Sequence, residues 1–156
     1  MKTSLFRICM ILALALAVSP AMLRAQEGSG LLGVWNVAVT VRNCSTGDVI
    51  RVVNSLQMFG RDGSETETAN TASRGISVGV WSNAGGQTYN ANYWFYRYTT
   101  SGTFASLAKA TETIVLGDNN QFTSSGVIQD FDASGNLIST GCVTHAATRL
   151  ANATQQ

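Results

Sequence analysis

Proline, lysine and histidine are scarce in this chain. Its 156 residues include one proline, Pro20, and one histidine, His145, and charged residues make up 12% of the total. Lys2 and Lys109 are the lysines, and like charges form no run anywhere. Such a chain has no basic surface to attract nucleic acid or an anionic membrane. The composition therefore indicates that nucleic acid is not a partner.

The common catalytic and nucleotide-binding motifs are also missing. The sequence contains no P-loop, no dinucleotide-binding glycine pattern, no G-x-S-x-G and no H-E-x-x-H. A single histidine needs carboxylates or thiolates beside it to hold a metal. We therefore expect no cofactor, no metal site and no assigned catalytic residue, and an enzyme is the less favoured class.

The N-terminus has the pattern of a signal peptide. Lys2 and Arg7 precede the apolar run 8–18, which is short for a membrane span, and small residues follow it. We predict a signal peptide over 1–25, one domain over 26–150 and a frayed tail over 151–156; an uncleaved anchor is the alternative. After cleavage, seven basic residues stand against nine acidic ones, a net charge of −2. The protein is expected to be exported and free of the membrane.

Two cysteines, Cys44 and Cys142, remain after the predicted cleavage. Exported chains meet an oxidising environment, in which a pair of cysteines commonly forms a disulfide. Two free buried thiols, or pairing between molecules, are the alternatives.

The rest of the chain shows the pattern of an all-β protein. Apolar and polar residues alternate, glycine-bearing turns interrupt the alternation about every ten residues, and no helical period is sustained. Short loops between successive runs favour an eight-stranded antiparallel up-and-down barrel. The runs cover residues 31–42, 49–59, 64–69, 76–82, 88–99, 104–116, 122–132 and 137–150.

Closure of this barrel would pair its first and last strands. If Cys44 faces Cys142 across that seam, Val41 faces His145 and one disulfide staples the barrel. The same register places Arg149 diagonally beside Trp35, within reach of a cation–π contact. His145 then points towards the interior, where a hydrogen-bonded core histidine is favoured over a catalytic base.

The two ends of the domain resemble a known superfamily. Gly33-Val34-Trp35 opens the first strand and Arg149 ends the last, which is similar to the signature of lipocalins (calycins). The resemblance implies that Trp35 plugs one end of the barrel and that Arg149 packs across it. The wider pattern, from GVWNV through GGQTY, FYRY and FDASGN to TGC and TR, resembles a family of uncharacterised exported bacterial proteins. That likeness implies an exported barrel and no known activity.

The aromatic strand over 88–99 carries the best candidates for a site. Its hairpin register sets Tyr93 near Ala110 and Ala91 near Glu112, so large rings face alanines and leave room for a cavity. The opposite face, with Trp94, Tyr96 and Tyr98, could instead form an exposed aromatic patch. The candidate cavity residues are Tyr89, Tyr93, Phe95, Arg97, Phe104, Glu112, Ile114 and His145.

Other acidic residues have a structural interpretation. Glu65 and Glu67 alternate in SETETA and are expected on a solvated edge strand, with a catalytic or Ca²⁺-binding pair as the lesser alternative. Asp130 and Asp132 flank Phe131 before a turn and are expected to form it.

Three functions fit these features. The first is a carrier that holds a small apolar or amphipathic molecule inside the barrel. The second is a cofactor-free isomerase or cyclase, with Glu112 as a base whose pKa burial raises and with Tyr93 or Arg97 stabilising charge. The third is an interaction module that uses the outer aromatic face, and an oligomer stays open. A barrel simply filled by side chains is the remaining interpretation.

Overall fold

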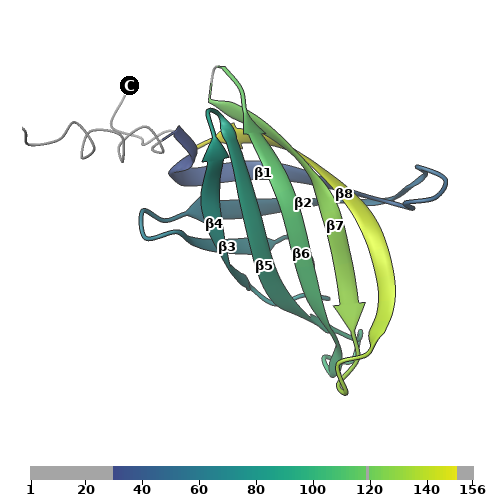
Figure 1. Cartoon of the computed structure of the whole chain (residues 1–156). Coiled ribbons are helices and arrows are strands. Elements are labelled where there is room, and N and C mark those ends of the chain that lie inside the picture. Colours follow the sequence, from purple (N-terminus) through teal and green to yellow (C-terminus); the bar gives the residue numbers. More distant parts are fainter. Residues whose placement is uncertain (1–29, 119, 151–156) are drawn as a thin grey trace, which may run out of the picture.

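The protein forms one closed antiparallel barrel of eight strands, joined in sequence order (Figure 1). The computed structural model describes residues 30–118 and 120–150; the predicted signal peptide and tail lie outside them. The strands are β1 (Gly33–Arg42), β2 (Val49–Phe59), β3 (Ser64–Ala69), β4 (Ser77–Gly85), β5 (Thr88–Tyr98), β6 (Phe104–Leu116), β7 (Gln121–Phe131) and β8 (Leu137–Arg149). The predicted fold class is confirmed. No helix in the described part of the chain could cross a membrane.

The up-and-down order gives the barrel two different ends. The start of β1, the end of β8 and the turn 60–63 lie at one end, which we call the plugged end. The loop 70–76 and the turns 99–103 and 132–136 lie at the other, which we call the open end. The hairpin between β1 and β2 projects well beyond its neighbours (Figure 1).

A disulfide links Cys44 and Cys142, as predicted, with 5.0 Å between the two Cα atoms. The predicted seam register is wrong by two residues: Val41 pairs with Val143, and Trp35 pairs directly with Arg149. The reason is that Cys44 lies in the turn beyond β1, where it need not face Cys142 across the ladder. Cys142 itself pairs with Arg42. The disulfide therefore joins the turn beyond β1 to β8 at the end of the seam.

An aromatic cluster fills the plugged end. Trp35 is fully buried and its Nε1 donates a hydrogen bond to the Leu31 carbonyl at 2.9 Å. Its ring lies 4.8 Å from that of Phe122, edge to face. The Arg149 guanidinium lies 4.1 Å from the Trp35 ring centroid and donates hydrogen bonds to the carbonyls of Leu32 and Gly30. The contact predicted between the two is present.

Gly33 is required where the chain enters β1. Its φ is +120°, and a Cβ there would lie 2.9 Å from Nη1 of Arg149. A side chain at this position would be strained and would displace the arginine.

Arg149→Lys is expected to destabilise the protein by roughly 1–2 kcal/mol although the charge is kept. Lysine cannot lie flat on Trp35 and bind two carbonyls at once. Chemical denaturation measures the difference, and Arg61→Lys, at an exposed turn residue, is the control. Equal stability of Arg149→Lys and wild type would contradict this role.

The orientation of β2 differs from what an apolar interior would require. Ile50 and Val52 are exposed at 62% and 60%, whereas Ser55 and Gln57 on the same strand are buried at 4% and 1%. The polar face of this strand thus points inward. The interior of the barrel is consequently polar along the wall that β2 and β3 form.

Candidate functional site

Strands β5 and β6 supply the predicted inner wall. Tyr93 pairs with Ala110 and Ala91 pairs with Glu112, as the hairpin register predicted. Six of the eight candidate residues are buried inside the barrel: Tyr89, Tyr93, Phe95, Glu112, Ile114 and His145. The aromatic rings opposite alanines therefore belong to the interior, and Trp94, Tyr96 and Tyr98 belong to the outer face.

Glu112 is the centre of a buried hydrogen-bond network. Tyr93 donates its hydroxyl to Oε1 of Glu112, and Ser124 donates to Oε2 at 2.7 Å. Nδ1 of His145 lies 3.0 Å from the same Oε2. Glycine at position 126 leaves room for the Glu112 side chain, because a Cβ at this position would lie 2.9 Å from Cα and 3.0 Å from Cγ of Glu112.

The charges of this network stabilise one another. Burial alone would raise the pKa of Glu112, but His145, Tyr93 and Ser124 outweigh it and hold that pKa below its ordinary value. Burial opposes the charging of His145, yet Glu112 raises its pKa above the ordinary value. The expectation that burial makes Glu112 a base of raised pKa is therefore wrong, because its oxygens are already bound.

Glu65 and Glu67 lie inside the barrel, and the expected solvated edge does not exist. They are 1% and 2% exposed, since closure leaves β3 without an edge and turns these carboxylates inward. Oε1 of Glu65 accepts a hydrogen bond from Nε2 of Gln57 at 2.7 Å. Burial raises the pKa of Glu65 to about 8, and the nearby charges of Glu67 and Glu112 add to the effect while Gln57 opposes it.

Arg74 provides the charge partner of Glu67. It lies on residues 70–76, a segment we call the strap, which runs beside β5 through the hydrogen bond from Gly75 N to Tyr96 O at 2.9 Å. Nη2 of Arg74 is 2.5 Å from Oε2 of Glu67, and its Cζ is 3.6 Å from the ring centroid of Phe95. The strap thus inserts a cation into the barrel from the open end.

A second ion pair lies at the open end. Nε of Arg97 donates to Oδ1 of Asp130 at 2.6 Å. Ser106 donates to the same oxygen at 3.2 Å, and Ser139 donates to Oδ2 at 2.9 Å. Asp130 is thus an ion-pair residue and not the turn former expected. Asp132 does form the turn, since its side chain accepts from backbone N–H groups of residues 134 and 136.

A cavity of about 380 Å³ opens beside this ion pair. Its apolar lining comes from Val41, Ile50 and Ile128, and its charged lining comes from Arg51, Arg97 and Asp130; Ser139, Thr140 and Gly141 complete it. Cavities of this size accept small organic molecules.

Several buried polar atoms lack a hydrogen-bond partner among the described residues. They include Nε2 of His145, Oε2 of Glu65, Oε1 of Gln57 and Oγ of Ser55. Buried polar groups are costly unless they are hydrogen-bonded, to protein, water or ligand. The interior therefore has spare donors and acceptors.

Phe104 is misplaced among the predicted cavity residues. It is 44% exposed and packs edge to face on Tyr96, 6.0 Å between ring centroids. The cause is a bulge after Arg97, which pairs Tyr98 with Phe104 and turns that ring outward. Tyr96 is the exposed member of the outer aromatic face; Trp94 and Tyr98 are half-buried.

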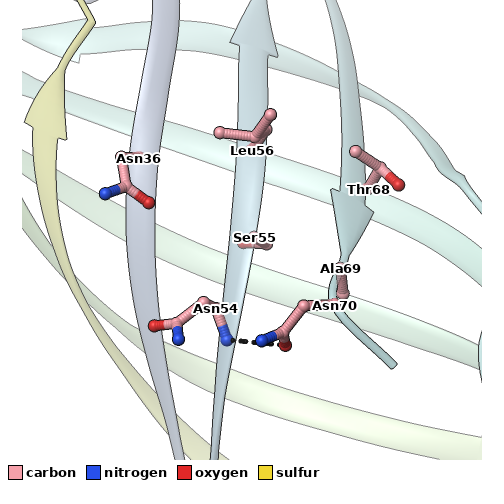
Figure 2. A pocket seen from close by; sticks show the side chains of 7 residues that line it. All are labelled: Asn36, Asn54, Ser55, Leu56, Thr68, Ala69 and Asn70. Atoms are coloured by element: carbon pink, nitrogen blue, oxygen red, sulfur yellow. Dashed lines mark hydrogen bonds between the residues drawn. The ribbon is translucent and has the colours of Figure 1, made fainter. Parts of the chain in front are cut away.

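A second hollow lies where β1, β2 and the end of β3 meet (Figure 2). It measures about 290 Å³ and is lined by Asn36, Asn54, Ser55, Leu56, Thr68, Ala69 and Asn70. The side-chain carbonyl of Asn70 accepts from the backbone N–H of Asn54 at 3.1 Å, and the backbone bond from Asn70 N to Asn54 O is 2.9 Å. These amides therefore serve to end the β2–β3 ladder.

Sequence reasoning missed Arg51, Arg74 and Gln57 as residues of the interior or its mouth. The alternation of residues places Arg51 and Gln57 on the same face of β2. That this face points into the barrel follows only once Glu65 of β3 is known to accept a hydrogen bond from Gln57. For Arg74 no local pattern exists, because it lies in a loop.

No family model, curated protein or solved structure matches this chain. Within residues 30–118 and 120–150, no group of three or more His, Cys, Asp or Glu side chains could hold a metal ion.

Proposed function

We propose that the protein is an exported, lipocalin-like barrel that binds a small amphipathic molecule through its open end. The observation that carries this proposal is the cavity of about 380 Å³, which joins an apolar lining to charged groups. The polar barrel interior below it offers buried donors and acceptors without partners among the described residues. Disulfides are typical of exported proteins, so the Cys44–Cys142 bond supports export.

Apolar lining and charged lining have different roles in such a site. Contact with Val41 and Ile128 would supply most of the binding free energy through burial of apolar surface, about 25 cal/mol per Å². The charged and hydroxyl groups would fix the orientation of the bound molecule. The ligand would lie against Val41 near the seam, within reach of both kinds of group.

Val41→Trp is expected to abolish ligand binding by filling the cavity. Native mass spectrometry of protein purified from its natural compartment, together with thermal shift across an amphiphile panel, measures binding. Val52→Trp places the same ring on the outer face of the barrel, where Val52 is 60% exposed, and should bind as wild type does. Wild-type protein that is always empty and never shifts would overturn the proposal, as would undiminished binding by a folded Val41→Trp.

A further inference from the structure

Three arginines, Arg51, Arg74 and Arg97, lie near the open end of the barrel. Burial lowers the pKa of Arg51, and the positive charges of Arg97 and Arg74 add to this effect. Two of the three arginines have acidic partners: Arg74 pairs with Glu67, and Arg97 with Asp130. Arg51 has no acidic partner within 4.0 Å in the part of the chain that the structure describes.

The carboxylate of Asp130 is already occupied. Its Oδ1 accepts from Arg97 and Ser106, and its Oδ2 accepts from Ser139. It therefore holds Arg97 in place but is committed to these three donors. Arg97 donates to Asp130 through its Nε, so its two terminal nitrogens take no part in this hydrogen bond.

Arg97 is further held by an aromatic ring. Its Cζ lies 4.9 Å from the ring centroid of Phe95, the ring that also contacts Arg74. A guanidinium fixed by a carboxylate and a ring loses little conformational entropy on binding. Burial first, and then the charge of Arg97, lower the pKa of Arg51, while Asp130 opposes this effect. A bound anion, in addition to Asp130, would reduce the repulsion between the positive charges of Arg51 and Arg97.

We propose that the molecule bound at the open end is an anionic amphiphile, with a carboxylate or an equivalent acid group held between Arg51 and Arg97 and an apolar part against Val41, Ile50 and Ile128. This inference rests on the proposed function, since it names the class of ligand for the same cavity. Arginine suits this role because its planar fork of donors matches the two oxygens of a carboxylate.

The test compares molecules of one length and different head groups. Octanoate, octanol and octylammonium are titrated into the whole oxidised protein by calorimetry at low salt, and acetate is titrated as the acid group without the apolar chain. Octanoate should bind roughly tenfold or more tightly than octanol, because a charge-assisted hydrogen bond is stronger than a neutral one. Octylammonium should bind most weakly, and added salt should weaken octanoate alone.

Arg51→Gln should lose much of the preference for octanoate over octanol, because Arg97 alone then holds the acid group, whereas Arg51→Lys should retain more of it. Arg61→Gln is the matched control, because it removes the same charge from an exposed residue at the plugged end and should keep the wild-type preference. Circular dichroism verifies that each variant is folded.

Each of the remaining outcomes overturns a different part of the proposal. If octanol binds as well as octanoate, the anionic ligand is ruled out while small-molecule binding stands. If folded Arg51→Gln keeps the full preference, the placement of the acid group between Arg51 and Arg97 is ruled out. If acetate binds as tightly as octanoate, the apolar lining contributes nothing and the amphiphile is ruled out. If none of the molecules binds, the proposed function fails as well.

Discussion

Replacing Cys44 and Cys142 together with serine is expected to lower the free energy of unfolding by roughly 4–5 kcal/mol. The disulfide joins residues separated by 98 positions, nearly the whole described barrel. Its loss frees the unfolded chain to adopt many more conformations, and the entropic cost of closing so long a loop must then be met on folding. The change should appear as a fall in Tm of roughly 15 °C.

The position of the bond explains why its removal should be tolerated by the fold itself. Cys44 is in a turn and Cys142 pairs with Arg42, so both lie at the end of the β1–β8 seam. The ladder from Trp35 to Val41 does not include either sulfur. Reduction of the wild-type protein should reproduce the double variant, and a reductant should leave that variant unchanged. An identical Tm with and without the bond would show that the seam is closed by its hydrogen bonds alone.

The alternation of residues was sufficient to predict the barrel. Eight runs with short connections gave the strand number and order, and the pairing of Tyr93 with Ala110 followed from a single tight hairpin. Local patterns determine such features because each hairpin is constrained by its own turn. The seam between β1 and β8 has no turn, so its register depended on an assumed facing of two cysteines and was wrong by two.

The candidate site was predictable on β5, β6 and β8, where most residues of the inner face are apolar. Tyr93, Phe95 and Ile114 follow the usual rule that apolar residues lie inside, and they do. Glu65 and Gln57 break the rule together: each is buried because the other, on the neighbouring strand, accepts or donates its hydrogen bond. Such mutual compensation joins residues of two strands, and a sequence without its pairing register does not reveal it.

Glu65→Gln is expected to stabilise the protein at neutral pH and to remove much of its pH dependence. The ordinary pKa of a glutamate side chain is 4.5. In the folded barrel the pKa of Glu65 is raised to about 8, and burial is the largest cause. Between these values the unfolded chain has lost the proton that the folded protein keeps. The stability that protonated Glu65 contributes is thus fully present below pH 4.5 and is lost as pH rises towards 8.

At 1.36 kcal/mol per pH unit, the wild type should lose roughly 3 kcal/mol between pH 4.5 and 7, and Glu65→Gln should not. The amide of glutamine can still accept the hydrogen bond from Gln57. His145, whose pKa is raised, also favours lower pH, and Glu112, whose pKa is lowered, loses its contribution as pH falls below 4.5. Both residues remain in the variant, so the difference between the two proteins isolates Glu65.

Glu67→Gln is the matched control on the same strand, and it should act in the opposite direction. It removes the negative partner of Arg74, a side chain only 7% exposed, and leaves that cation unpaired in the barrel. Breaking a buried pair in this way costs about 3–5 kcal/mol. Urea denaturation at several pH values between 4.5 and 8.5 measures all three proteins. A constant difference between wild type and Glu65→Gln across this range would mean that Glu65 is ionised in the folded state, and that water or a bound cation reaches it inside the barrel.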